Sequence, residues 1–237
     1  MTDINEIADG IYRISTYIPG YPVTLAQFLI KDEKPFLFET GPKATFTDTL
    51  EAVRKIIDPS TLAYIGWSHL EGDECGAAND FLSVAPAAEL ICGEMGVFLG
   101  VGDFFTAPVR GLKDDEVLDL GERKLRCLVT PHVPHHWDAS LLFEEKTETL
   151  FASDLMTHLG ETKAISDEDI VERALETYRQ VPDYLVVDAH MARVFDRLER
   201  LQPKLLAGHH SPAFAGDTAR ALIDFRSGLL RTAEIQS

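Results

Sequence analysis

Four apolar segments of this chain are each followed by histidine or carboxylate side chains, and this feature most limits the folds open to it. The segments are LAYIGW (62–67), LRCLVT (125–130), TLFAS (149–153) and PKLLAG (203–208). Short apolar runs bounded by polar residues predict buried strands. Side chains at the carboxyl ends of strands in one sheet can meet although they are far apart in sequence. The sequence therefore predicts a site built from distant segments.

The candidate ligands fall into four islands, one behind each segment. The islands contain His69, Glu71, Asp73 and Glu74; His132, His135, His136 and Asp138; Asp154; and His209 and His210. Six of the eight histidines lie in them, all except His158 and His190. A lone aspartate after a strand usually caps a turn, so each island alone is a weak signal. Together they predict a metal site, and the alternative is a rim of hydrogen-bonded polar loops.

The order of the predicted elements indicates an α/β (α+β) chain with two similar halves. Residues 45–93 alternate helix and strand, which is typical of parallel crossover units. Two hairpins follow at 116–130 and 139–153, and 93–107 has no firm assignment. We predict one domain, 1–237, with two facing sheets and helices outside. The predicted strands are 10–16, 24–31, 35–40, 62–67, 88–93 and 203–208, and the predicted helices are 47–57, 76–86, 167–181 (capped by Ser166 or Asp167), 184–201 and 217–231.

The charge of the chain argues against several classes of partner. The 22 basic and 39 acidic residues give a net charge of −17, which disfavours nucleic acid and anionic membranes. The three cysteines, Cys75, Cys92 and Cys127, form no disulfide pattern, and the N-terminus has no signal-peptide character. We therefore expect a soluble cytoplasmic protein that binds neither nucleic acid nor membrane.

The order of the islands resembles the metallo-β-lactamase fold, a four-layered αββα sandwich of two facing mixed β-sheets with a binuclear metal site. Its hydrolytic members have H-x-H-x-D-H as the first ligand motif, and this chain has H-x-E-x-D-E at 69–74. The glutamate at position 71 is similar to the diiron branch, the flavodiiron and oxygen-binding diiron proteins, whose motif is H-x-E-x-D-H. Glu39, in FLFETG, stands where the family usually has aspartate.

The resemblance implies a ligand set that is carried over residue by residue. It makes Asp154 the carboxylate that bridges two metals, and Asp154 and Glu71 the residues nearest the chemistry. His135 is preferred to its neighbour His136, because it lies 19 positions before Asp154. Glu74 departs from the histidine of the branch, so an altered second metal position is expected. The predicted metal ligands are His69, Glu71, Asp73, Glu74, His135, Asp154 and His209.

The residue types in this set favour iron over zinc. Carboxylate oxygens are harder ligands than imidazole and suit iron or manganese. Two metal ions, with iron as the expected metal and zinc or manganese as alternatives, are therefore predicted. Four aromatic residues were considered as pocket walls, namely Trp137, Phe104, Phe105 and Phe214, although core positions are commoner for aromatic residues. His132 is a candidate neighbour of the ligands, and His158, His190 and His210 are expected to be structural or exposed.

The resemblance leads to three functional hypotheses. The first is a diiron protein that binds, senses or reduces O₂ or NO, with an external electron donor and a possible homodimer. The flavodiiron relatives carry a flavodoxin-like domain, and no FMN is expected in this chain. The second is a hydrolase of an ester, thioester or phosphodiester that uses a metal-bound hydroxide. The third is a metal-free binding module.

Overall fold

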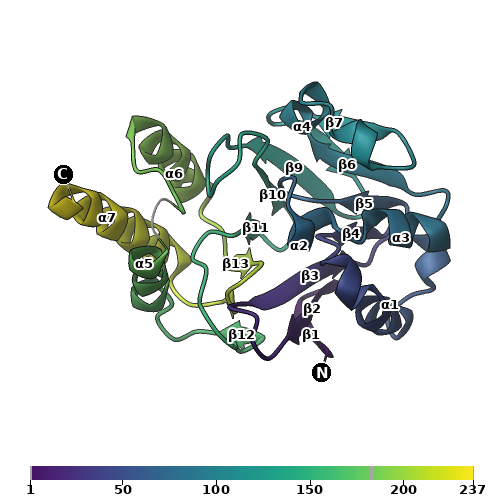
Figure 1. Ribbon diagram of the computed structural model, residues 1–237, viewed down its shortest axis with the longest axis horizontal. Helices are drawn as coiled ribbons and strands as arrows, with labels where there is room; N and C mark the ends of the chain where they lie inside the picture. Colours follow the sequence, from purple (N-terminus) through teal and green to yellow (C-terminus); the bar gives the residue numbers. More distant parts are fainter. Residues whose placement is uncertain (1, 182–183, 237) are drawn as a thin grey trace.

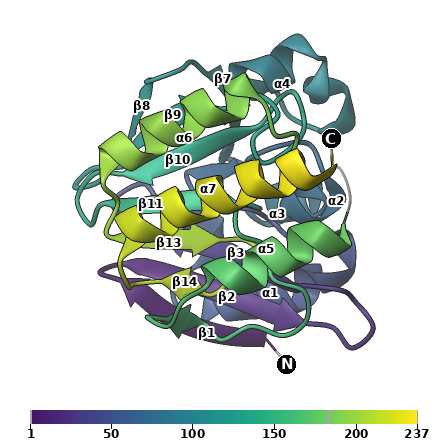
Figure 2. The same cartoon turned by 90° about the vertical axis from the view of Figure 1, so that its left-hand side faces the viewer.

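The computed structural model describes residues 2–181 and 184–236, which form a four-layered αββα arrangement (Figure 1). Two sheets face each other, with α1, α3 and α4 outside the first sheet and α5, α6 and α7 outside the second. Figure 2 shows α5, α6 and α7 lying across the second sheet. The helices are α1 (Phe46–Arg54), α2 (Gly72–Cys75), α3 (Ala78–Val84), α4 (Glu94–Phe98), α5 (Val171–Gln180), α6 (Ala189–Leu201) and α7 (Thr218–Gln236), with 3₁₀ turns η1 (Lys43–Thr45), η2 (Pro59–Thr61) and η3 (Val101–Phe104).

The first sheet has its strands in sequence order, from β1 to β7. The strands β1 to β4 are antiparallel, and β4 to β7 are parallel, so the predicted crossover units are confirmed. The carboxyl ends of β4 and β5 consequently lie at the same edge. The strands are β1 (Thr2–Ala8), β2 (Ile11–Tyr17), β3 (Thr24–Ile30), β4 (Phe36–Phe38), β5 (Tyr64–Gly66), β6 (Glu89–Gly93) and β7 (Val109–Leu112).

The second sheet contains both predicted hairpins. Its order is β12-β14-β13-β11-β10-β9-β8, and β11 runs parallel to β13. The β8–β9 and β10–β11 pairs are antiparallel, as predicted. The strands are β8 (Val117–Asp119), β9 (Lys124–Val129), β10 (Ser140–Glu144), β11 (Thr149–Ser153), β12 (Ile165–Ser166), β13 (Leu205–Gly208) and β14 (Ala213–Phe214).

Alternating side chains on buried strands create three separate apolar interfaces. In β11, Leu150 and Ala152 face the core under α5, α6 and α7, whereas Phe151 faces the core between the sheets. The inner core brings Phe28 and Phe38 of the first sheet against Phe151, with ring centroids 5.3 and 5.7 Å apart. A third core lies between the first sheet and its helices. The two-residue period of a strand thus explains why β11 is buried at every position, since both of its faces pack against a core.

The predicted four-layered fold is confirmed, and several local predictions need correction. The strand β1 was missed, and the unassigned stretch 93–107 contains α4 and η3. The predicted helix at 167–181 begins only at Val171, and neither Ser166 nor Asp167 caps it. Asp169 accepts a hydrogen bond from the backbone N–H of Val171 at 2.7 Å and orders the entry to this helix instead. None of the described helices combines the length and apolarity that crossing a bilayer requires.

Replacing Phe151 should test the inner core directly. Phe151→Ala removes a buried ring between the two sheets, so we expect the free energy of unfolding to fall by about 3 to 5 kcal/mol. Urea denaturation followed by circular dichroism measures this change. The matched control is Ile223→Ala in α7, whose side chain is exposed, and it should change the free energy by less than about 0.5 kcal/mol. Equal effects of the two substitutions would contradict the described core.

Candidate metal centre

The four predicted islands meet at one edge of the two sheets. The loop after β5 carries His69 to Glu74, the β9–β10 loop carries His135 and His136, and the ends of β11 and β13 supply the remaining residues. A backbone hydrogen bond of 2.9 Å from the N–H of Ser140 to the carbonyl of Ser68 joins the first two loops across the sheets. The sheet packing therefore determines which loops face each other.

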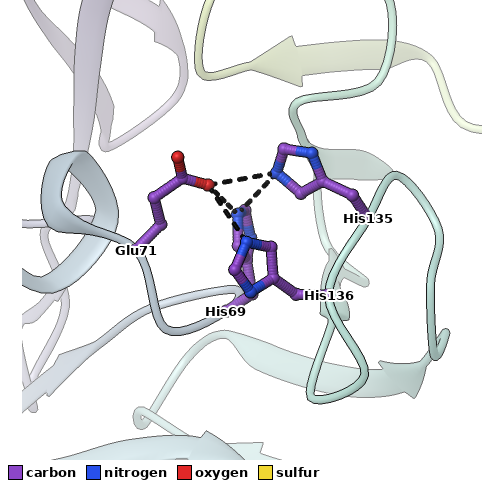
Figure 3. A group of neighbouring side chains, drawn as sticks. All are labelled: His69, Glu71, His135 and His136. Carbon is purple, nitrogen blue, oxygen red and sulfur yellow. Dashed lines mark hydrogen bonds and ion pairs between the residues drawn. The ribbon is translucent and has the colours of Figure 1, made fainter. Parts of the chain in front are cut away.

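One cluster consists of His69, Glu71, His135 and His136 (Figure 3). Oε2 of Glu71 lies 3.2, 3.3 and 3.4 Å from Nε2 of His69, His135 and His136. The Nε2 atoms of His69 and His135 are 2.9 Å apart. Donor atoms about 2.1 Å from one metal lie roughly 3 to 3.5 Å from their neighbours. This cluster therefore has the spacing of a mononuclear ligand set.

A second cluster consists of Asp73, Glu74, His209 and His210. Nε2 of His210 lies 3.4 Å from Oδ2 of Asp73. Nε2 of His209 lies 4.0 Å from the same oxygen and 4.0 Å from Oε1 of Glu74. The second cluster is more deeply buried than the first, because Glu74, His209 and His210 are all inaccessible to solvent or nearly so.

Asp154 lies between the two clusters. Its Oδ2 is 3.0 Å from Nε2 of His135, and its Oδ1 is 3.4 Å from Nε2 of His210. The phenol of Tyr184 also donates a hydrogen bond to Oδ2, at 3.1 Å. One carboxylate thus faces a donor of each cluster with a different oxygen. This is the arrangement that the resemblance implied for a bridging ligand.

The structure brings all seven predicted ligands together and adds His136 and His210. His210 was expected to be structural or exposed, and it is instead buried with Nε2 facing Asp73 and Asp154. Its Nδ1 lies 2.9 Å from the carbonyl oxygen of Thr24, which fixes the ring. A metal-binding histidine commonly has its second nitrogen held in this way. The choice of His209 over its neighbour missed this contact, because Thr24 is remote in sequence.

The buried polar atoms of the site fit a bound cation. Both carboxylate oxygens of Glu74, Oδ1 of Asp154 and both ring nitrogens of His209 are buried without a hydrogen-bond partner among the described residues. A buried carboxylate without a partner costs several kcal/mol, unless a cation offsets its charge. The donor set of imidazoles and carboxylates is one that iron, manganese and zinc accept. The residues present therefore fit a metal centre.

Burial disfavours the charged form of two acids on the first-sheet side, Glu74 and Glu39. Burial raises the pKa of Glu74 well above its ordinary value, and the charges of Asp154, Asp73 and Glu39 add to this effect. Burial likewise raises the pKa of Glu39, against the opposing hydrogen bond from Ser68. Glu39 lies behind the first island, where its Oε2 accepts a hydrogen bond of 3.4 Å from the Ser68 N–H. The carboxyl groups on this side of the site therefore lie close enough to raise one another's pKa values.

The acids that face histidines are held in their charged form. Hydrogen bonds from His135 and His69 hold the pKa of Glu71 far below its ordinary value. Burial opposes ionisation of Asp154, but the imidazole of His210 and the hydrogen bond from His135 outweigh it and lower its pKa. Burial also disfavours charge on His135, yet its hydrogen bonds to Asp154 and Glu71 raise its pKa to about 9. Burial, followed by the neighbouring His210, lowers the pKa of His209.

Serine side chains hold the ligand loops in place, and several residues of these loops have strained backbone conformations. The hydroxyl of Ser68 lies 2.9 Å from Nδ1 of His69 and accepts a hydrogen bond of 2.8 Å from Ser153. Ser153, Glu39 and His136 all have left-handed backbone conformations, with φ of 49°, 60° and 62°. Such conformations cost roughly 1 to 3 kcal/mol each and concentrate at functional sites. The fold therefore maintains this edge at a cost in stability.

Asp138 and the three remaining histidines have supporting positions. Asp138 accepts a hydrogen bond of 2.9 Å from the N–H of Leu70 and so ties the β9–β10 loop to the first island. Nε2 of His158 lies 2.9 Å from the carbonyl oxygen of Ile170, and Nε2 of His190 lies 2.6 Å from that of Pro131. Both histidines are therefore structural, as expected. His132 is exposed and lies outside the two clusters.

A cleft of about 240 Å³ opens onto the site. Tyr21 and Tyr184 line it, together with a largely aliphatic wall. None of the four aromatic residues weighed as walls lines the cleft. Phe214 is in the core, the position that the sequence favoured, Phe105 stacks on Trp67, and Phe104 and Trp137 are 65% and 48% exposed. The sequence offered no signal for the two tyrosines, since each reaches the cleft from a distant loop. The other residues lining the cleft are Pro22, Val23, Glu71, Asp73, His135, Asp154, Thr157, Leu159, Thr177, Val181 and His210.

Cys75, which directly follows the first island, is a buried residue at the end of α2. Burial raises the pKa of its thiol to about 12. A thiol with so high a pKa is protonated near neutral pH and is a poor nucleophile. Cys75 therefore belongs to the packing around the site.

The double sheet with its site at one edge defines a protein of the metallo-β-lactamase fold. The profile of the family described as "ODP family beta lactamase" matches residues 23–211, which is most of the chain. This chain belongs to that family.

Curated relatives of this chain are larger proteins. Flavo-diiron protein FprA2 of Clostridium acetobutylicum is 24% identical over 226 residues, which cover 87% of this chain and 56% of that protein. Putative diflavin flavoprotein A 1 of Thermosynechococcus vestitus is 31% identical over 198 residues, covering 80% of this chain and 34% of the other. The chain therefore spans between a third and somewhat more than half of these relatives.

Solved structures support the fold. The rubredoxin oxygen:oxidoreductase of Desulfovibrio gigas superimposes with a TM-score of 0.82 at 20% identity, covering 95% of this chain and 61% of that one. A fragment of putative diflavin flavoprotein A 5 of Nostoc sp. PCC 7120 gives a TM-score of 0.80 at 17% identity and is covered to 98%, as is this chain. The predicted relationship to the flavodiiron group is thus confirmed.

The burial of Glu74 leads to a prediction for the metal-free protein. Glu74→Met replaces an unpartnered buried carboxylate with an apolar side chain of similar length. We therefore expect the free energy of unfolding of the metal-free protein to rise by about 1 to 3 kcal/mol. Urea denaturation in the presence of a chelator measures this change.

The matched control for this prediction is Glu51→Met, because the side chain of Glu51 is 57% exposed. It should change the free energy of unfolding by less than about 0.5 kcal/mol. A large loss of stability in Glu74→Met would show that the carboxylate is stabilised by groups other than a cation.

Proposed function

We propose that the chain holds a binuclear non-haem iron centre that binds, senses or reduces O₂ or NO. The observation that carries this proposal is the pair of histidine–carboxylate clusters with Asp154 between them. The first cluster, with His69, Glu71, His135 and His136, would hold the first ion. The second cluster, with Asp73, Glu74, His209 and His210, would hold the second ion. Asp154 would bridge the two ions.

The oxygen-rich donor set supports iron as the resident metal. Glu71, Asp73, Glu74 and Asp154 give four carboxylates in and between the two clusters. Anionic oxygen donors suit the harder, redox-active metals and offset the charge of two ferric ions. Two iron ions in this position would supply electrons and open coordination positions for a diatomic ligand.

The described side chains around the clusters would orient the reactants and hold a proton beside Asp154. The phenol of Tyr184 donates to Asp154, and Thr157 lies 3.2 Å from the same phenol. Burial raises the pKa of Tyr184 well above its ordinary value, so the phenol keeps its proton. Val23 and Leu159 provide an apolar wall that limits the access of water. A small apolar molecule such as O₂ or NO can enter a cleft with apolar side chains at little cost in desolvation.

The names of the relatives support an oxygen reaction and an electron donor. A relative from Megalodesulfovibrio gigas, 23% identical to this chain, is named rubredoxin-oxygen oxidoreductase. We extend to this chain the oxygen chemistry in that name, together with an electron donor that is a separate protein. The absence of FMN from this chain, the homodimer and the cytoplasmic location stay predictions.

A metal-dependent hydrolase is the second candidate function. The cleft of about 240 Å³ is several times larger than a diatomic ligand needs, since a liquid water molecule occupies about 30 Å³. This room favours an organic ester, thioester or phosphodiester as substrate. Optical absorption separates the candidates, because a diferric centre absorbs in the near ultraviolet and visible and a zinc centre does not.

Replacing Asp154 tests the diiron proposal. We expect the wild-type protein, expressed without added metal and purified without a histidine tag, to contain close to two irons per chain. Asp154→Ala removes the carboxylate between the clusters, so its iron content should fall to one or less. The change in visible absorption on adding O₂ or NO to the reduced protein should be lost with it.

The control for this experiment is Asp103→Ala, which removes an exposed carboxylate in η3 and should leave the iron content and the absorption change intact. Full iron content and an unchanged O₂ response in Asp154→Ala would refute the proposal. Zinc or manganese in the wild-type protein in place of iron would favour the hydrolase.

A further inference from the structure

The two clusters differ in the kind of donor that they offer. Three imidazoles and one carboxylate, from Glu71, form the first cluster. Two carboxylates and two imidazoles form the second. Asp154 faces both clusters and so adds one carboxylate oxygen to each, which leaves the difference in donor composition between them unchanged. The two halves of the proposed centre are therefore chemically unequal.

His136 makes the first cluster rich in histidine. Its Nε2 lies 3.4 Å from Oε2 of Glu71, a separation close to the 3.2 and 3.3 Å of His69 and His135 from the same oxygen. Figure 3 shows the three rings converging on this carboxylate from two different loops. The left-handed backbone at His136, with φ of 62°, holds it in this loop beside His135. A third imidazole is a donor that borderline ions such as Zn²⁺ and Fe²⁺ favour.

Glu74 makes the second cluster rich in oxygen and negative charge. Its two oxygens are buried without hydrogen-bond partners among the described residues. Its Oε1 lies 4.0 Å from Nε2 of His209 and 3.9 Å from Nε2 of His69, so Glu74 belongs to the second cluster and lies on the side that faces the first. Asp73 provides a second carboxylate beside it. Glu39 is a further carboxyl group that is fully buried on the same side. Hard cations such as Mn²⁺ and Fe³⁺ favour such oxygen donors.

We propose that the two positions select different metals, with a borderline ion in the histidine-rich cluster and a harder ion in the carboxylate-rich cluster. This inference rests on the proposed binuclear centre and deepens it. If both ions are iron, the carboxylate-rich second position should stabilise the ferric state more than the histidine-rich first position does. With two different metals, it produces an ordered mixed pair.

A balanced competition between Zn²⁺ and Mn²⁺ tests the proposal without any assay of activity. The metal-free protein receives one equivalent of each ion per chain, so that every ion finds a position. All of the zinc and all of the manganese are then bound, so the generally higher affinity of zinc does not affect how the ions are shared among chains. Only the difference in metal preference between the two positions decides whether a chain holds a mixed pair or two like ions. Metal analysis after gel filtration counts the ions, and electron paramagnetic resonance reports on the neighbour of each Mn²⁺.

We expect one zinc and one manganese per chain and the spectrum of isolated Mn²⁺. Protein loaded with manganese alone should instead show an exchange-coupled pair, which confirms that both positions fill. Anomalous scattering from crystals of the mixed form should place zinc at His136 and manganese at Glu74.

Two substitutions should each weaken the selection. His136→Ala removes the third imidazole from the first cluster, and Glu74→Gln removes a negative charge from the second at nearly constant size. In each variant we expect the ratio of mixed to like pairs to fall by about tenfold or more. The matched control is His132→Asn, since His132 is an exposed residue of the same loop outside both clusters, and asparagine tolerates its φ of 63°.

Three outcomes would overturn the proposal. They are a coupled manganese pair in the equimolar wild-type sample, the reverse placement of the two metals, and an unchanged ratio in both variants. These failures are distinct from failure of the proposed function. Iron-loaded protein that binds neither O₂ nor NO would refute the oxygen function and leave the metal selection standing.

Discussion

The buried carboxylate of Glu74 is the constraint on which the rest of the site depends. Neither of its oxygens has a hydrogen-bond partner among the described residues, and Asp73, Asp154 and Glu39 repel its charge. A core that only had to be stable would not contain this group, because an apolar residue of the same size avoids the desolvation cost. The remaining described contacts near it make sense if a cation supplies the missing charge.

The four-layered packing is what lets such a costly group persist. The inner faces of the two sheets meet through Phe28, Phe38 and Phe151, and this apolar core holds the strand ends at a fixed spacing. The Ser140–Ser68 backbone hydrogen bond then fixes the β9–β10 loop against the first island. Stability gained in the interior therefore offsets strain and buried charge at the edge, a division that is common in proteins with active sites.

Much of the fold and of the site could be predicted from the sequence, and the errors have a common physical origin. Strands with two buried faces have continuous apolar runs, as in β10 and β11, and strands with one buried face alternate, as in β8, so both hairpins could be predicted from the sequence. The seven predicted ligands do converge, because donors at strand ends share one edge. The structure places both His209 and His210 in the second cluster, and the sequence alone did not show that His210 also faces it. The orientation of that ring depends on the carbonyl oxygen of Thr24, a contact between segments 186 residues apart that no local pattern encodes.

Neighbouring histidines occur twice at this site, and in each pair the structure gives the two rings different surroundings. His135 faces both Asp154 and Glu71, whereas His136 faces Glu71 and is the more exposed of the two. His210 is held by a backbone carbonyl, whereas His209 is fully buried with both nitrogens unpartnered among the described residues. Adjacent residues on a loop point in different directions, so a pair of histidines can serve two donor positions around one ion. Each pair therefore places two imidazoles beside the carboxylates of one cluster, so that a cluster can offer two neighbouring histidines to one ion.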